Sequence, residues 1–263
     1  MGKQQAPPTQ PDFIKWLLLA GAAVMVVLAG AYLGWHYILP HLHRSVTVDR
    51  LRYPIAGLDV SNHNGVINYD SVREANYQFV FVKASEGKTF KDPAFGRNYD
   101  GARRAGLKVG AYHFFRKNRT AEQQAANFLD VIQGRPLDLP LVIDLEDDWG
   151  NGATTSHETA VERLLDMIAI LKDRGYQVMI YTNNDGYNKY YKDMLGDCDL
   201  WLCSFTNPDL LDLPHLIQQY SHEGEVNGVD GDVDLNVFRG SRAEWERYLE
   251  QVQQPSQETS PQQ

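Results

Sequence analysis

The sequence predicts an α/β fold, an irregular TIM-like (β/α) barrel, preceded by one N-terminal transmembrane helix. From residue 55 onward, short apolar runs alternate with amphipathic ones, which is the pattern of strands and helices in such a barrel. Acidic and aromatic residues recur where the apolar runs end, and the chemistry of these barrels collects at the carboxyl ends of the strands. A separate long apolar run near the N-terminus predicts the transmembrane helix.

Length and charge limit the classes of protein to consider. The 263 residues, 43% of them hydrophobic, are enough for one sizeable domain with appendages. The net charge of −9 argues against a nucleic-acid partner, because no basic stripe could offset it. Neutral or mildly cationic substrates fit this composition better.

The N-terminal region divides into three parts. Residues 1–12 are polar and proline-rich, so we expect a disordered tail. Residues 13–39 are expected to form a single-pass signal anchor, because no charge occurs from Trp16 to Trp35 and aromatic residues flank the run. A cleaved signal peptide is the alternative, but the apolar core is too long and no small-residue cleavage site follows it. Residues 40–54 are a linker.

We expect one barrel domain over residues 55–250 and a disordered, Gln-, Pro- and Ser-rich tail over 251–263. Helices are expected mainly between the first six strands, at 69–75, 92–104, 120–132 and 156–174. The region 205–238 lacks a helical pattern. The eight expected strands are 55–60, 78–84, 107–114, the start of 139–148, 177–182, 200–205, 216–220 and 232–238.

The stretch 139–148 is a short apolar run that ends in Asp144 and Glu146. Side chains alternate along a strand, so these two carboxylates should point to the same face. Crowding raises the pKa of one of them, which makes a proton donor and an anion side by side. The alternative is that they cap the next helix. The acids at other strand ends, Asp59 and Asp234 among them, favour a cleft instead.

Five short motifs follow one another along the domain. They are Gly57-Leu58-Asp59-Val60-Ser61, Val82-Lys83-Ala84-Ser85-Glu86-Gly87, Gly110-Ala111-Tyr112-His113-Phe114, Asp144-x-Glu146 and Val233-Asp234-Leu235-Asn236. Over residues 55 to about 240, the chain resembles the glycoside hydrolase family 25 lysozymes, the Chalaropsis-type N-acetylmuramidases. The resemblance implies a barrel that hydrolyses the β-1,4 bond between N-acetylmuramic acid and N-acetylglucosamine in bacterial peptidoglycan. No cofactor and no metal site are expected.

By the same resemblance, Glu146 matches the general acid, and Asp144, Asp59 and Asp234 match the acids around it. Glycoside hydrolysis needs a proton for the departing oxygen and negative charge near an oxocarbenium-like centre, which this set can supply. We expect Glu146 to hold its proton tightly. Asp144 either accepts its hydrogen bond or steadies a substrate acetamido nitrogen. The nucleophile stays open; the Asp-x-Glu pair also resembles family 18 chitinases, which favours retention with substrate assistance.

Eight further residues are candidates for binding the glycan, each with a structural alternative. The tyrosines stack on sugars or merely fill the barrel top, and Lys83 is a structural ion-pair partner of Asp59 or Glu86. Glu86 is more easily a wall residue than a second acid. The candidates are Tyr112, Phe114, Tyr181, Tyr220, Glu86, Lys83, Trp149 and Asn64.

Some positions depart from the family pattern. Gln218-Gln219-Tyr220 stands where the family often has Trp-Gln-Tyr, Asn64-Gly65 replaces Gln-Gly, and Tyr69 replaces a tryptophan. Loss of an aromatic wall would reshape a sugar subsite without touching the acids.

His113 has no partner at metal-ligand spacing and is expected in the core. Cys198 and Cys203 are expected as small core or surface residues rather than a disulfide.

The leading hypothesis is therefore a membrane-anchored muramidase whose catalytic domain lies on the periplasmic or extracytoplasmic side. Its partners would be peptidoglycan glycan strands and, through the anchor, the lipid bilayer. One alternative is a catalytically weak or inert peptidoglycan-binding module on the same fold. Another is a metal-dependent hydrolase that uses the four acids as oxygen ligands.

Overall fold

The computed structural model describes residues 21, 23–30, 32, 46–146 and 154–253. The chain forms two compact units, Met1–Arg44 and Ser45–Gln263. In the first unit, residues 23–30 are helical. Among the residues described, no helix has the length and apolar character needed to cross a membrane. Most of the expected anchor over 13–39, and the whole tail over 1–12, lie outside the described residues.

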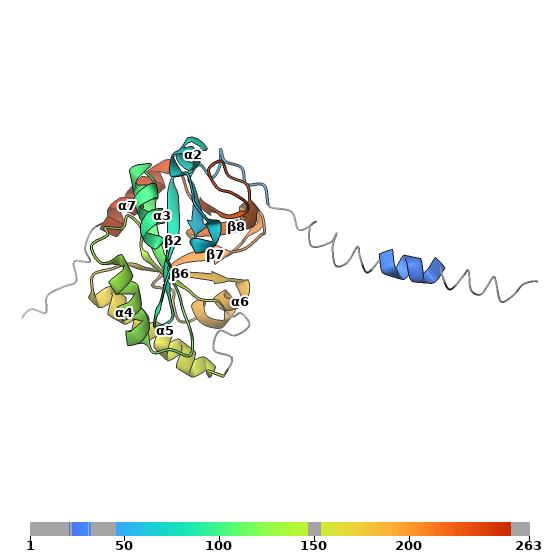
Figure 1. Cartoon of the computed structure of the whole chain (residues 1–263). Helices are drawn as coiled ribbons and strands as arrows, with labels where there is room; N and C mark the ends of the chain where they lie inside the picture. The colour runs from blue at the N-terminus through green and yellow to red at the C-terminus, as the bar shows by residue number, and fades with distance from the viewer. Residues whose placement is uncertain (1–20, 22, 31, 33–45, 147–153, 254–263) are drawn as a thin grey trace, which may run out of the picture. The chain divides into compact units, whose positions relative to one another are not determined.

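The second unit is built on a closed sheet, and Figure 1 shows helices α3, α4 and α5 packed against its outside. The sheet order is β1-β9-β8-β7-β6-β5-β4-β2-β3, and a further pairing of β1 with β2 closes eight strands into a barrel. All eight expected strands form; the short β3 was not predicted. The strands are β1 (Ala56–Val60), β2 (Phe79–Glu86), β3 (Phe90–Lys91), β4 (Lys108–Phe114), β5 (Leu141–Asp144), β6 (Val178–Asn183), β7 (Asp199–Cys203), β8 (Ile217–Gly224) and β9 (Val233–Phe238).

The barrel is irregular at its end because β9 runs antiparallel to both β1 and β8. An antiparallel partner can be reached through a short loop, whereas a parallel one needs a crossover, so no long helix is required before β9. This agrees with the lack of helical pattern predicted for 205–238. The β1–β9 register makes Asp59 and Asp234 direct cross-strand partners.

The helices begin at side-chain caps that are readable in the sequence. The Thr120 side chain accepts from Gln123 N at the start of α4, and Ser156 accepts from Thr159 N at the start of α5. The α-helices are α2 (Tyr69–Glu74), α3 (Phe95–Arg104), α4 (Ala121–Ile132), α5 (His157–Asp173), α6 (Asn184–Gly186) and α7 (Arg242–Gln253). Short 3-10 turns cover Asn62–Asn64 and Pro208–Leu210, and a π-helical turn covers Tyr187–Tyr191.

Helix α7 was not predicted, and it extends to Gln253, inside the segment 251–263 that we expected to be disordered. Residues 254–263 lie outside the described part of the chain. Trp245 and Tyr248 of α7 pack with Phe79 and Phe238 in an apolar cluster inside the barrel. The helix therefore closes one end of the barrel, and a larger apolar cluster fills the space between the strands and α2 to α5.

Glycines make room for the aromatic rings inside the barrel. A Cβ at Gly57 would lie 2.3 Å from the ring of Phe79, and one at Gly110 would lie 2.4 Å from the ring of Phe81. Phe81 in turn stacks on Trp201, with 4.6 Å between the ring centroids. Because this layer fills the barrel at mid-height, open space remains at the carboxyl ends of the parallel strands.

Candidate active site

A cavity of about 380 Å³ opens at the carboxyl ends of the parallel strands. All four acids expected in the cleft line it, and so do four of the eight predicted glycan-binding residues. The lining residues are Asp59, Ser61, His63, Lys83, Tyr112, Phe114, Asp144, Glu146, Tyr181, Trp201, Cys203, Phe205, Gln219, His222 and Asp234.

Asp59 and Asp234 form a hydrogen-bonded carboxyl pair across the β1–β9 ladder. Burial raises the pKa of Asp59 well above its usual range, and the negative charge of Asp234 raises it further. Burial also raises the pKa of Asp234, to about 6. The two carboxyl groups therefore influence each other's titration, and Asp234, with a pKa of about 6, is mostly ionised near neutral pH.

Two buried amides fix the Asp59 carboxyl group. Gln219 Nε2 and Asn236 Nδ2 donate to Asp59 Oδ2 over 3.0 and 2.7 Å. Hydrogen bonds to the amide oxygens set the orientation of both amides. Trp201 Nε1 donates to Asn236 Oδ1 over 2.8 Å, and the Tyr181 hydroxyl donates to Gln219 Oε1 over 2.8 Å. An indole N–H can only donate, so the Asn236 oxygen must face it and the Asn236 nitrogen must face Asp59.

Asp144 ends β5 and is buried, whereas Glu146, the second residue after it, is partly exposed. Both line the cavity, so the structure brings them to one face, as their spacing predicts. Glu146 is therefore within reach of a ligand that enters from solvent. The general-acid role of Glu146 stays a prediction.

Tyr112, Phe114, Tyr181 and Lys83 are the predicted glycan-binding residues that reach the cavity. Burial raises the pKa of Tyr112 well above its usual value, and so do the charges of Asp59 and Asp144, so its phenol stays neutral and can donate a hydrogen bond. Lys83 Nζ donates to Glu86 Oε2 over 2.9 Å, which agrees with the structural ion pair considered for it. The same ammonium group lies 5.1 Å from the centre of the Phe114 ring.

The other four predicted binding residues are not among the lining residues. Glu86 accepts from Lys83 and Arg116 and lines a neighbouring groove. Tyr220 is buried in the outer apolar cluster, which raises its pKa to about 12. Asn64 accepts from Ser61 N over 2.9 Å and closes the turn after β1. Trp149 lies outside the described residues.

The sequence interpretation missed several lining residues, and strand alternation could have found some of them. Trp201 and Cys203 share a face at the end of β7, and Gln219 lies on the opposite face of β8 from Tyr220. The prediction named the aromatic residue Tyr220, whose side chain faces the outer apolar cluster and not the cavity. Phe205, the last residue of the strand predicted over 200–205, lies in the loop after β7, and its ring centroid is 4.7 Å from that of His222 in β8, a position that no pattern marked.

His113 and the cysteines take the structural roles expected of them. His113 is fully buried between Ser85 and Gln124, and burial lowers its pKa to about 4, so it is a neutral core residue. Cys198 is a buried free thiol, and Cys203 is a free thiol in the cavity wall, where burial raises its pKa to about 12. Within 46–146 and 154–253, no three His, Cys, Asp or Glu residues are grouped so as to hold a metal ion.

The family model for glycosyl hydrolases family 25 matches residues 58–229 of this chain. The chain is 33% identical to an autolytic lysozyme of Clostridium acetobutylicum over 69% of its own length, and it spans only 55% of that relative. It is 35% identical to lysozyme M1 of Streptomyces globisporus over 72% of this chain and 69% of the relative.

A solved structure shows the same fold. A family 25 glycosyl hydrolase from Bacillus anthracis is 34% identical and superimposes with a TM-score of 0.72, covering 78% of this chain and 98% of that one. The matched region contains β5, most of β1, and the acids Asp59, Asp144 and Glu146, whereas Asp234 lies just beyond it. On the family match, the identities and the shared barrel, the chain belongs to glycosyl hydrolases family 25 and is a glycoside hydrolase.

Proposed function

We propose that the chain is a Chalaropsis-type N-acetylmuramidase, a lysozyme that hydrolyses the β-1,4 bond between N-acetylmuramic acid and N-acetylglucosamine in peptidoglycan. The observation that carries the proposal is the convergence of four carboxyl groups from β1, the end of β5 and β9 on one open cavity. The names of the relatives, lysozyme and autolytic lysozyme, point to the same reaction.

The geometry supports different catalytic roles for these acids. Glu146, partly exposed at the cavity wall, donates a proton to the departing glycosidic oxygen. Asp234, whose pKa is about 6, is ionised near neutral pH and supplies negative charge beside Asp59. That charge lies in a largely buried site, where it stabilises a developing oxocarbenium ion more strongly than it would in water.

Substrate assistance completes this mechanism. The acetamido oxygen of the substrate attacks the anomeric carbon, and Asp144 accepts a hydrogen bond from the acetamido nitrogen as positive charge grows there. Water then attacks the anomeric carbon and gives a proton to the Glu146 carboxylate, while the bond to the acetamido oxygen breaks, so the product retains the β configuration. Proton NMR of the first turnovers should show the β-anomer of the new reducing end; an initial α-anomer would rule the mechanism out.

Activity of the full-length protein on purified peptidoglycan tests the reaction. Replacing the general acid, as in Glu146→Gln, should lower the rate of reducing-end release by about 100-fold or more, since general acid catalysis contributes about that much. Glu162→Gln, an exposed position on α5, is the matched control and should cleave like wild type. Glycan binding without reducing ends in the wild type would support the inert binding module instead.

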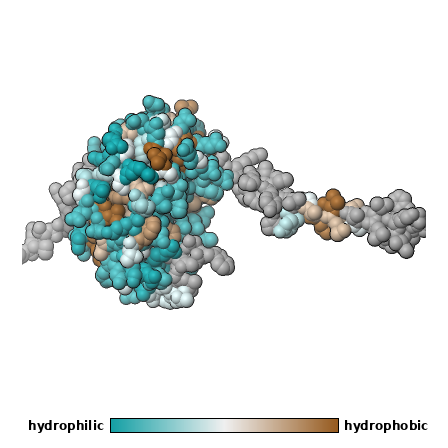
Figure 2. Space-filling model, viewed as in Figure 1, coloured by the Kyte–Doolittle hydropathy of each residue, from teal (hydrophilic) through white to brown (hydrophobic). Residues whose placement is uncertain are grey.

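We also propose that residues 13–39 anchor the protein in a membrane, with the barrel on the periplasmic or extracytoplasmic side. The support is the uncharged run from Trp16 to Trp35 and a substrate that lies outside the cytoplasm. Residues 24–28 are more than half exposed and apolar, and Figure 2 colours this stretch hydrophobic.

Fractionation of cells tests this anchor. The full-length protein should stay with membranes after alkaline carbonate extraction, and protease added to intact spheroplasts should digest the barrel. Release by carbonate, or protection of the barrel until the membrane is lysed, would contradict the proposed topology.

A further inference from the structure

A second hollow lies beside the active-site cavity, and positive charge predominates in its walls. It measures about 510 Å³. Three cationic side chains and one carboxylate line it, in a chain whose net charge is −9. We name it the cationic groove; its lining includes Glu86, Gly87, Lys88, Phe90, Arg116 and Arg119.

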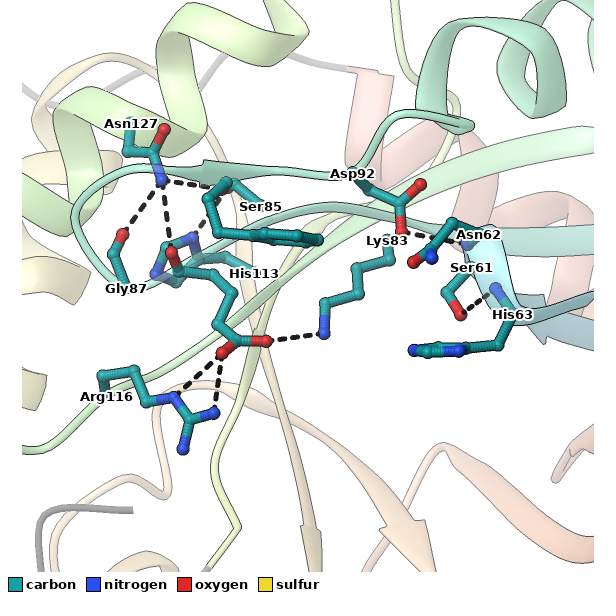
Figure 3. Close-up of polar contacts among 12 residues, drawn as sticks. Ser61, Asn62, His63, Lys83, Ser85, Gly87, Asp92, His113, Arg116 and Asn127 are labelled. Atoms are coloured by element: carbon teal, nitrogen blue, oxygen red, sulfur yellow. Dashed lines mark hydrogen bonds and ion pairs between the residues drawn. The ribbon is translucent and has the colours of Figure 1, made fainter. Parts of the chain in front are cut away.

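The cationic groove shares a wall with the active-site cavity. Phe114 lines the cavity, and the Arg116 guanidinium lies 4.7 Å from the centre of its ring while lining the groove. Lys83 of the cavity and Arg116 of the groove both donate to the Glu86 carboxylate, and Figure 3 shows the Lys83 and Arg116 side chains with these contacts as dashed lines. The cationic groove therefore lies next to the active-site cavity, with Phe114 and the Lys83–Glu86–Arg116 contacts between the two.

The positive charge of the cationic groove is available to a ligand. Burial alone would raise the pKa of Glu86, but the hydrogen bonds and charges of Lys83 and Arg116 outweigh it and lower that pKa. Glu86 is thus ionised and already balanced by these two partners. Among the described residues, Lys88 and Arg119 form no ion pair with a carboxylate, so both remain to bind an anion.

Buried amides of α4 hold both walls of the groove in place. Asn127 Nδ2 donates to the carbonyl oxygens of Gly87 and Phe90, each over 3.0 Å (Figure 3). Gln124 Nε2 donates to the carbonyl oxygens of Arg116 and Arg119 over 3.1 and 3.3 Å. The backbone around the groove is therefore fixed before a ligand arrives, which lowers the entropy cost of binding.

Gly87 makes room for the side chains of Arg116 and Arg119. Its φ is +51°, which a residue with a Cβ rarely adopts. A Cβ there would lie 3.1 Å from Cγ of Arg116 and 3.9 Å from Cγ of Arg119. The same glycine thus permits the turn and the close approach of two cationic side chains.

The geometry points to a specificity subsite for the carboxylates of the peptide stem that N-acetylmuramic acid carries, an inference that rests on the proposed muramidase function. The sugars of the glycan backbone are largely uncharged, whereas stem peptides end in and carry free carboxylates. Lys88 and Arg119 pair with these carboxylates. Phe90, 44% exposed, packs against the aliphatic side chains of the stem.

A stem fits better than an unrelated anionic wall polymer because the cationic groove adjoins the cavity. A polymer that is not the substrate could bind anywhere on the surface, and its site would not need to adjoin the active-site cavity. A stem attached to a sugar in the cavity must stay close to the cavity, and the contact between Phe114 and Arg116 places the cationic groove beside it.

The test compares the full-length enzyme on glycan strands with intact stems and on strands whose stems an amidase has removed. Wild type should cleave the stem-bearing strands with a kcat/KM about tenfold higher, since two exposed charge pairs contribute roughly that factor. The charge-reversal variant Lys88→Glu/Arg119→Glu should lose this preference. Added salt should weaken it in the wild type, because exposed charges are screened.

Arg242→Glu/Arg247→Glu is the matched control, because it changes the net charge equally on exposed positions of α7. It should keep the wild-type preference. The inference is overturned if wild type shows no preference, or if Lys88→Glu/Arg119→Glu retains it. It is also overturned if polyglycerol phosphate binds through Lys88 and Arg119 while stems do not. A wild type that cleaves neither strand would refute the muramidase function itself.

Discussion

At the residue scale, the site depends on how Asp59 is held. The sequence identified the four acids, because strand ends and family motifs mark them. It did not identify Trp201, Gln219 and Asn236 as the residues that orient Asp59, because their roles arise from strand register. Gln219 lies beside Tyr220 in the sequence; alternation shows that the two face opposite sides of β8, and the observed structure shows that Gln219 is the one that faces the cavity.

The Asp59–Asp234 pair should leave a signature in the pH dependence of stability. On folding, the pKa of Asp234 rises from 3.8 to about 6. A group with a raised folded pKa stabilises the protein fully below its unfolded pKa and loses that contribution as pH rises through the folded pKa. Relative to Asp234→Asn, wild type should therefore lose roughly 2–3 kcal/mol of unfolding free energy between pH 4 and pH 7.5.

Urea unfolding of the full-length protein in detergent, followed by tryptophan fluorescence, measures this difference. Asp232→Asn is the matched control, since Asp232 is exposed and does not line the cavity. Its stability should change with pH in parallel with wild type. A constant offset between wild type and Asp234→Asn across this range would show that the pair does not titrate as described.

Trp201→Phe should separate orientation of Asp59 from general packing. Phenylalanine keeps an aromatic ring beside Phe81 and Tyr181 but removes the N–H that fixes the Asn236 amide. We expect about 1–3 kcal/mol lower stability from the unpaired buried oxygen. We also expect a kcat about tenfold lower, equivalent to ~1.4 kcal/mol. Trp245→Phe in α7 should lower stability while sparing kcat; an equal loss of kcat there would argue against a specific role for Trp201.

At the element scale, hydrophobic alternation and helix caps predicted most of the strands and helices. The eight barrel strands and helices α2 to α5 follow from local patterns that agree with their tertiary contacts. The direction of β9 could not be read, because parallel and antiparallel strands share the same apolar pattern. The β3 strand is too short for a pattern, and α7 was hidden by a sequence rich in charged and polar residues.

The interior of the barrel should be sensitive to single added methyl groups. Gly110→Ala would place its Cβ 2.4 Å from the Phe81 ring and 3.0 Å from Cβ of Leu139. Overpacking of this kind costs about 1–3 kcal/mol of unfolding free energy, which urea titration would detect. At Gly196 a Cβ meets no atom within 4 Å, so Gly196→Ala should change stability by under about 0.5 kcal/mol. Similar values for both variants would contradict the packing described.

At the scale of the whole molecule, charge is distributed unevenly in a chain of net charge −9. Acids converge in the cavity, and cations predominate in the adjoining groove. On the face shown in Figure 2, hydrophilic residues cover most of the barrel unit, with hydrophobic residues in small groups. This arrangement suits a glycoside hydrolase that engages a largely neutral glycan with acids and its charged substituents with cations.

We propose that the four-acid cavity cleaves peptidoglycan between N-acetylmuramic acid and N-acetylglucosamine with Glu146 as proton donor. Mass spectrometry of the muropeptides released by the full-length enzyme tests it most directly. Wild type should yield products with N-acetylmuramic acid at the reducing end, and Glu146→Gln should yield almost none. Reducing-end N-acetylglucosamine would contradict the proposed bond specificity, and undiminished release by Glu146→Gln would contradict its role as proton donor.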